Sequence, residues 1–234
     1  MTKHKENIIL PDTVRNFLQD VVWEINPKFR IRNKAHPTGL YSIARVFIKL
    51  FNKEIDTRYI TVINGECWFP SSYFSEDGKK FINDSTGVLS VLAHESVHEL
   101  DRKRLGTIPF TALYLFPQIL AVFSLLSILA VWNLNWLWCL LFLLCLTPLP
   151  APGRVYLETR GYKMNMSFAR IRGLNLDDYA SAIITQQFTS PAYYFMAYPW
   201  SRGTIKEDLT DPSHENDEEI YTKSIEWIKN LEQL

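Results

Sequence analysis

Residues 105–153 read LGTIPFTALYLFPQILAVFSLLSILAVWNLNWLWCLLFLLCLTPLPAPG and contain no Asp, Glu, Lys, Arg or His over 49 positions. A helix rises ~1.5 Å per residue, so it needs roughly 20 residues to cross the ~30 Å hydrocarbon core of a bilayer. The run is long enough for two crossings and predicts a transmembrane helical hairpin over 108–150. Its arms are expected at Ile108 to Val131 and at Trp136 to about Pro150, with the turn at Asn133-Leu134-Asn135.

The charges on either side of this run predict its orientation. Arg102, Lys103 and Arg104 precede it and Arg154 follows it, while the turn carries no charge. Because Lys and Arg are enriched in cytoplasmic loops, both polar halves of the chain and both termini are expected in the cytoplasm. The sequence thus predicts an integral membrane protein with two transmembrane helices. A buried helical hairpin in a soluble protein is the alternative.

The overall composition narrows the class of protein further. The chain has 25 Lys and Arg residues against 25 Asp and Glu residues, and no basic tract. Nucleic-acid binding draws its affinity from basic side chains that neutralise phosphates, so no nucleic-acid partner is expected. An apolar content of 47% argues against a disordered chain. The three cysteines lack C-x-x-C spacing, which favours a reducing compartment.

The residues before the charge-free run are typical of a mixed α/β half. A helix is expected after Asp12, a plausible N-cap, and it should end at Asn26-Pro27. A second helix, from about Thr38 to Asn52, is apolar on most faces, so it belongs either in the core, which we favour, or on the bilayer surface. Residues 59–69 hold two β-prone runs around Asn64-Gly65, a strong signal for a β-hairpin.

The segment His94-Glu95-Ser-Val-His98 has the pattern H-E-x-x-H, on a helix expected to begin near Asp84-Ser85. Residues four apart lie on one face of a helix, so both imidazoles can reach one Zn²⁺ ion. Glu95 would then lie beside the metal and accept a proton from its bound water. The pattern predicts a catalytic zinc site of a metallopeptidase. Two surface histidines on an ordinary helix are the alternative.

A third zinc ligand has three candidates, Asp101, Glu158 and His214. Asp101 follows His98 too closely to complete a tetrahedron easily and better suits a partner for an imidazole N–H. A solvated charge near the end of the helix is an equal alternative for Asp101. Glu158 lies in a predicted helix that begins where the second membrane arm ends, beside the H-E-x-x-H helix if the hairpin returns the chain to its entry face. Gly161 would permit close approach there. We therefore favour Glu158, against a plain surface acid. His214 is expected to be a solvated surface residue, and donation to a developing oxyanion is its alternative role.

This order of features resembles the integral-membrane gluzincins, the group that contains the CAAX prenyl proteases and the heat-shock-linked bacterial membrane metallopeptidases. In that family, H-E-x-x-H is followed by a pair of membrane helices and then by a helix that supplies a glutamate ligand, usually within E-x-x-A-D. The match here is Glu158-Thr-Arg-Gly161-Tyr162. Tyr162 thus stands where the family has an aspartate that supports a histidine ligand.

The resemblance covers the range from about residue 88 to about residue 170, and a weaker match covers residues 209–231. Residues 1–60 match no family that we can name, and the membrane helices that usually precede H-E-x-x-H are absent. A soluble-type gluzincin with a membrane hairpin insertion describes the chain equally well.

These features together predict an α+β, zincin-like, mostly helical metallopeptidase domain with a small sheet. We expect residues 1–107 to form its N-terminal half, 108–150 the hairpin, and 151–234 a helical C-terminal half. That last part should contain a helix over Asp177–Gln187, an aromatic loop over Pro191–Trp200, and a final helix from Asp211-Pro212.

The expected activity is that of a membrane-anchored zinc endopeptidase, in which Glu95 activates the zinc-bound water to hydrolyse a peptide bond. Its partners would be the lipid bilayer and protein or peptide substrates close to the membrane. A non-enzymatic membrane assembly or adaptor protein with a structural or vestigial metal site is the alternative. Glu95 discriminates between them, since only a hydrolase requires it.

Overall fold

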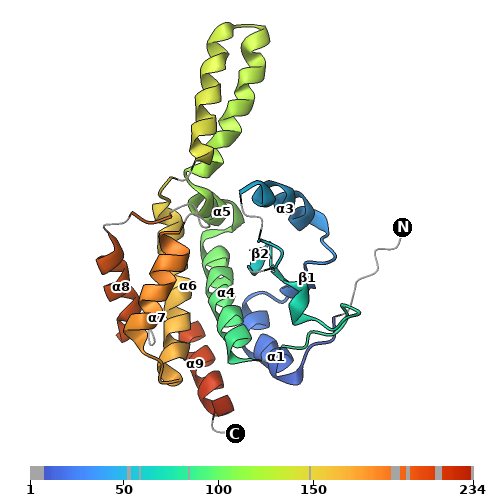
Figure 1. Ribbon diagram of the computed structural model, residues 1–234, viewed down its shortest axis with the longest axis vertical. Helices are drawn as coiled ribbons and strands as arrows, with labels where there is room; N and C mark the ends of the chain where they lie inside the picture. Colours follow the sequence, from blue (N-terminus) through green and yellow to red (C-terminus); the bar gives the residue numbers. More distant parts are fainter. Residues whose placement is uncertain are drawn as a thin grey trace. The chain divides into compact units, whose positions relative to one another are not determined.

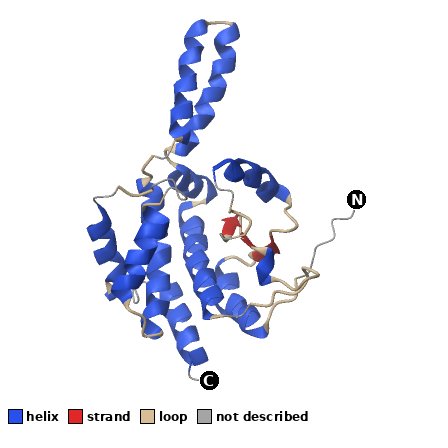
Figure 2. Ribbon diagram, in the orientation of Figure 1, coloured by secondary structure: helices blue, strands red, loops and turns tan. Residues whose placement is uncertain are grey.

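The computed structural model describes residues 8–51, 54–57, 59–83, 85–147, 149–190, 196–198, 201–213 and 218–232. It divides into two compact units, Met1–Glu99 with Glu219–Leu234 and Leu100–Glu218. This division differs from the three consecutive segments expected, because the last helix belongs with the N-terminal unit and the hairpin with the helices that follow it. Helices dominate both units, and the described strands form one small sheet (Figures 1 and 2), which confirms the α+β class.

The first unit combines helices with the sheet. Its elements are α1 (Asp12–Phe17), the π-helical turn η1 (Leu18–Val22), α2 (Trp23–Ile25), β1 (Arg30–Asn33), α3 (Gly39–Phe51), β2 (Thr61–Ile63), β3 (Glu66–Phe69), the 3₁₀ turn η2 (Ser71–Tyr73), α4 (Thr86–Leu105) as far as Glu99, and α9 (Glu219–Glu232). The first helix ends before Asn26-Pro27, as expected. Its cap position is Pro11 rather than Asp12, and the Asp12 carboxylate instead accepts a hydrogen bond from Arg15.

The sheet has the strand order β1-β3-β2, with β1 parallel and β2 antiparallel to β3. Asn64 and Gly65 join β2 to β3 with φ values of 52° and 77°, the left-handed conformation that a two-residue hairpin loop requires. The β-hairpin predicted from Asn64-Gly65 is therefore confirmed.

Helix α9 packs on the first helix of the same unit. The rings of Phe17 and Trp227 meet edge to face at 5.1 Å, and the Trp227 indole N–H donates to Asp20. Ile220, Ile225 and Ile228 form a buried apolar stripe on α9. The helix begins at Glu219, however, and not at Asp211-Pro212.

Helix α3 is not the core helix that we favoured. Its Tyr41 is buried and stacks on Trp68 with a centroid distance of 4.4 Å. Leu40, Ile43 and Val46, however, are 62%, 61% and 63% exposed. Their spacing of three residues places them on one face, so α3 buries one side against the sheet and leaves an apolar stripe uncovered.

The second unit consists of helices. Its elements are the last turn of α4, α5 (Thr107–Leu115), the 3₁₀ helices η3 (Gln118–Val131) and η4 (Leu134–Leu146), α6 (Pro152–Ile171), α7 (Leu176–Ile183), the π-helical turn η5 (Ile184–Phe188) and α8 (Arg202–Thr210). The predicted helices around Glu158 and over Asp177–Gln187 are confirmed as α6 and as α7 with η5. Helices α6, α7 and α8 surround an apolar core, in which Met196 and Ala197 are the buried part of the aromatic loop; most of that loop lies outside the described residues.

The hairpin has the predicted turn but not the predicted first arm. Asn133 Oδ1 accepts the Asn135 N–H at 2.9 Å between η3 and η4, which lie side by side (Figure 1). The first arm is broken at Pro117, because proline lacks an N–H and disfavours helical geometry at the residue before it. In the described chain no single helix is long and apolar enough to cross a membrane, although α5 and η3, bent by 93°, meet that test together.

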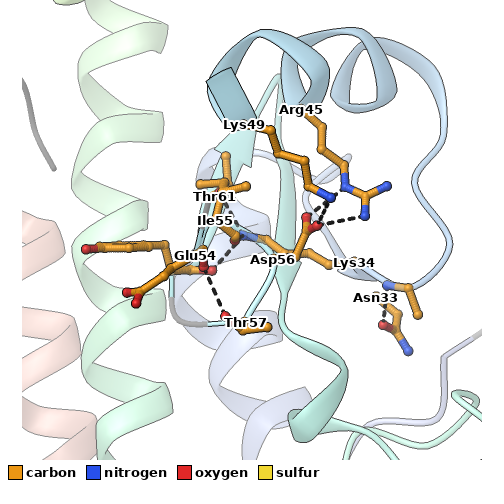
Figure 3. A network of polar contacts seen from close by, with 11 residues as sticks. Asn33, Lys34, Arg45, Lys49, Glu54, Ile55, Asp56, Thr57 and Thr61 are labelled. Atoms are coloured by element: carbon orange, nitrogen blue, oxygen red, sulfur yellow. Dashed lines mark hydrogen bonds and ion pairs between the residues drawn. The ribbon is translucent and has the colours of Figure 1, made fainter. Parts of the chain in front are cut away.

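Lys34, the residue directly after β1, is buried in a network of polar contacts in the first unit (Figure 3). Its ammonium donates to the Ile55 and Tyr59 carbonyls, both at 2.6 Å, and to Thr61 Oγ1 at 2.9 Å. Nearby, Asp56 accepts from Arg45, and its carboxylate also pairs with Lys49 of α3. Burial is the main reason that the pKa of Lys34 falls from 10.5 to about 8. Lys34 thus ties β1 to β2 and to the segment before it.

The lowered pKa of Lys34 should make the free energy of unfolding depend on pH. Unfolded Lys34 keeps its proton up to about pH 10 while the folded chain releases it near pH 8, so the free energy of unfolding should rise between these values, by at most ~1.4 kcal/mol per pH unit. Thermal unfolding in detergent between pH 7.5 and 9.5 should show the rise. Lys34→Met should lose it, and the exposed control Lys28→Met should keep it. Parallel profiles for all three proteins would disprove the assignment.

Candidate metal centre

Helix α4 presents His94 and His98 on one face. Its first half is held by the buried side chains Val88, Leu89 and Leu92, and both histidines are buried as well. The two imidazole Nε2 atoms lie 3.0 Å apart, with the rings edge to face. Two nitrogen ligands at ~2.0–2.1 Å from one tetrahedral zinc are about 3.3 Å apart. The geometry of the pair is therefore close to that of two ligands of one metal ion.

Each of the two histidines on α4 is followed directly by a glutamate, Glu95 or Glu99. Glu99 is buried and its Oε2 accepts the Asn26 side-chain N–H at 2.8 Å, whereas Glu95 is half-buried. Burial, and then the charges of Glu95 and Glu99, raise the pKa of the Cys67 thiol well above its ordinary value. The Cys67 thiol of β3 is therefore close enough to both carboxylates for their charges to act on it. Of the two acids, Glu95 is the one with the exposure that proton transfer requires.

In the second unit, Glu158 is buried on α6 and held by a residue that the sequence reasoning missed. Its Oε1 accepts the Tyr114 hydroxyl at 2.5 Å. Arg154 in turn donates to the Tyr114 main-chain oxygen at 3.0 Å and lies over its ring. Helix α5 comes close enough to α6 that a Cβ at Gly153 would lie 2.5 Å from the Leu113 carbonyl oxygen. Tyr114 falls within the first membrane arm that the sequence predicts. Because the chain breaks at Pro117, Tyr114 belongs to α5 instead, where its hydroxyl contacts Glu158.

Asp101, in the last turn of α4, has a different partner from the one expected. Both of its oxygens accept from Arg160 Nε at 3.1 Å, and Arg160 also pairs with Glu218 at 2.9 Å. Burial raises the pKa of Asp101 even though Arg160 opposes that shift. Asp101 therefore connects α4 to α6 through an arginine; we had expected it to accept from an imidazole.

The structure brings together three of the predicted site residues. His94, His98 and Glu158 are all buried and form a group that could hold a metal ion. Two imidazoles and one carboxylate are a common ligand set of catalytic zinc, so the donor chemistry fits. Tyr162 packs against Phe188 beside the apolar core of the second unit. His214 lies outside the described residues.

Loss of the Tyr114 hydroxyl should weaken metal binding. Residues that hydrogen-bond to a metal ligand typically contribute 10–100-fold to affinity, so Tyr114→Phe should raise the dissociation constant for zinc by roughly that factor. Competition with a chromophoric zinc chelator measures it on purified protein. Tyr156→Phe, at an exposed tyrosine of α6, is the matched control. Equal zinc affinity in the two variants would remove Tyr114 from the centre.

No family model, curated protein or solved structure matches this chain. The function is therefore inferred from the site and its surroundings.

Proposed function

We propose that this protein is a membrane-anchored zinc endopeptidase of the gluzincin type, in which His94, His98 and Glu158 hold the metal. The observation that carries the proposal is the 3.0 Å separation of the two Nε2 atoms within an H-E-x-x-H helix. A structural zinc site would need a closed set of four protein ligands, whereas three ligands leave a position for water and substrate. Glu95 beside the pair supports a hydrolytic centre.

The chemistry assigned to Glu95 is proton transfer. Zinc, when bound, polarises the scissile carbonyl and lowers the pKa of a coordinated water to about 7. The Glu95 carboxylate accepts a proton from the attacking water as the C–O bond forms. It then donates that proton to the nitrogen of the leaving amine as the C–N bond breaks. Tyr114 holds the Glu158 carboxylate in position through its hydroxyl.

The first unit supports a zincin-like arrangement, in which a sheet beside the metal-binding helix receives an extended substrate. Ile63 and Glu66 flank the two-residue turn and form a hydrogen-bonded pair, so the next pair, Val62 and Cys67, has its backbone groups turned outward. The N–H and C=O of Val62 therefore face the free edge of β2. These groups suit pairing with a peptide main chain of any sequence.

The membrane part of the proposal rests on exposed apolar surface. Side chains such as Leu125 and Ile128 are exposed on η3, and Trp132 and Trp138 are exposed around the turn, where interfacial tryptophans are expected. At ~2.0 Å per residue of a 3₁₀ helix, the 14 residues of η3 and the 13 of η4 extend roughly 28 and 26 Å. Both lengths approach the ~30 Å hydrocarbon core.

The same elements support action on substrates near the bilayer. Tyr114, which contacts Glu158, lies only three residues before Pro117, where the hairpin begins. The uncovered apolar stripe of α3 in the first unit is also suited to the membrane surface. That location is the alternative given for this helix in the sequence analysis.

Glu95→Gln should abolish hydrolysis without loss of metal. The amide can hydrogen-bond to water but cannot accept its proton, so peptide cleavage should fall by about 10²–10⁴-fold while zinc content stays unchanged. Glu99→Gln, one turn further along α4, is the matched control and should retain activity. Cleavage of a peptide library, read by mass spectrometry, measures both. Full zinc content with undiminished cleavage in Glu95→Gln would refute the assigned centre, and absence of cleavage by the unaltered protein would leave the non-enzymatic alternative.

The topology of the hairpin can be tested with cysteine labelling. After Cys67, Cys139 and Cys145 are replaced by Ala, a cysteine at Asn133 should react with an impermeant maleimide added outside intact cells. A cysteine at Arg154 should react only after the membrane is permeabilised, because the positive flanks stay in the cytoplasm. Labelling of both positions from the same side would rule out the hairpin.

A further inference from the structure

A groove of about 410 Å³ runs along β1 in the first unit. Ile31 lines it from one face of the strand, and Arg30 and Arg32 line it from the other, because successive side chains of a strand point to opposite faces. Arg15 and Trp23 of the first helix form part of the facing wall. Since both faces of β1 contribute, the groove follows the edge of the strand.

The edge of β1 along this groove carries backbone groups for a further strand. In the described sheet β1 pairs with β3 alone. The Arg30 N–H donates to the Gly65 carbonyl at 2.9 Å and the Lys34 N–H to the Phe69 carbonyl at 3.0 Å. Alternation along a parallel pair then turns the N–H and C=O of Ile31 to the opposite side, into the groove.

The charge of the groove has one sign. Three of its described lining residues are arginines and none is Asp or Glu. Arg15 pairs with Asp12, and Arg32 pairs with Glu66 of β3. Arg30 donates only to the main-chain oxygens of Pro27 and Phe29, at 2.9 and 2.7 Å, and forms no ion pair within the described residues. A carboxylate from a ligand would supply the partner that this guanidinium lacks.

We propose that this groove binds an extended acidic segment of a partner protein, which adds to β1 as a further strand. A partner residue opposite Ile31 shares the face of Ile31, and its two neighbours share the face of Arg30 and Arg32. The segment thus recognised is acidic–apolar–acidic, such as Glu-Val-Glu. The site is separate from the metal centre and does not depend on the peptidase proposal.

Backbone pairing selects a peptide over other anions. A phosphate or nucleic acid could reach the arginines but could not pair with the N–H and C=O of Ile31, and it would leave the apolar wall at Trp23 unused. A strand satisfies the backbone, the apolar wall and the charges together.

The test uses the full-length protein in detergent with Glu95→Gln, so that no peptide is cleaved. A fluorescent peptide with Glu-Val-Glu in a Gly/Ser frame should bind by anisotropy, and the Lys-Val-Lys peptide should not. Hydrogen bonds to charged groups contribute ~1.5–3 kcal/mol, so Arg30→Glu should weaken binding by about tenfold or more. Lys28→Glu makes the same change of charge outside the groove lining and should bind normally. N-methylation of the central valine should also abolish binding.

Each opposite result overturns the proposal. Equal loss in Arg30→Glu and Lys28→Glu would mean attraction by overall charge, and no effect of N-methylation would mean binding without strand pairing. A dimer that Arg30→Glu dissociates would make a second copy of the chain the occupant. If Arg30→Glu does not fold, Arg30→Gln keeps donors for the Pro27 and Phe29 carbonyls and should still lose the acidic peptide. Normal binding by Arg30→Gln would overturn the role of the charge.

Discussion

The pairing of Arg160 with Asp101 and Glu218 is the interaction that joins the last turn of α4 to α6 in the second unit. A guanidinium that leaves water loses several kcal/mol of hydration, so it must be matched by carboxylates at close range. Asp101 follows His98 by three residues on α4, and Arg160 follows Glu158 by two residues on α6. The ion pairs therefore fix α6 against the last turn of α4 within the second unit.

A second constraint connects Glu158 to the apolar hairpin. A buried carboxylate needs a donor, and Tyr114 supplies it from the short helix that ends just before Pro117. The proline thus has two effects. It frees α5 to pack on α6, and it redirects the chain into η3, whose exposed side chains are mainly apolar. Tyr114, the hydrogen-bond partner of Glu158, therefore lies only three residues before the proline at which the apolar hairpin begins.

The sequence predicted elements whose signals are local and missed contacts that depend on packing. Asn64-Gly65 predicts its β-hairpin because few residues accept positive φ, and His94 and His98 share a face because of helical spacing alone. The hydrogen bond from Tyr114 to Glu158 and the return of α9 to the first unit join residues far apart in sequence. Periodicity cannot reveal them. The exposed face of α3 was missed for a related reason: a helix that is apolar all round does not indicate which side its neighbours leave uncovered.

The two edges of the small sheet are open but differ in chemistry. Open edges invite unspecific pairing, which proteins limit with short strands and charged flanks. Strand β2 is three residues long, and its sequence Thr-Val-Ile carries no charge, so its side chains would select little by charge among segments that paired with it. Strand β1 itself carries Arg30 and Arg32, which repel basic segments and favour acidic ones. The two edge strands of one sheet thus differ in charge, and a segment that paired with β1 would meet arginines that β2 lacks.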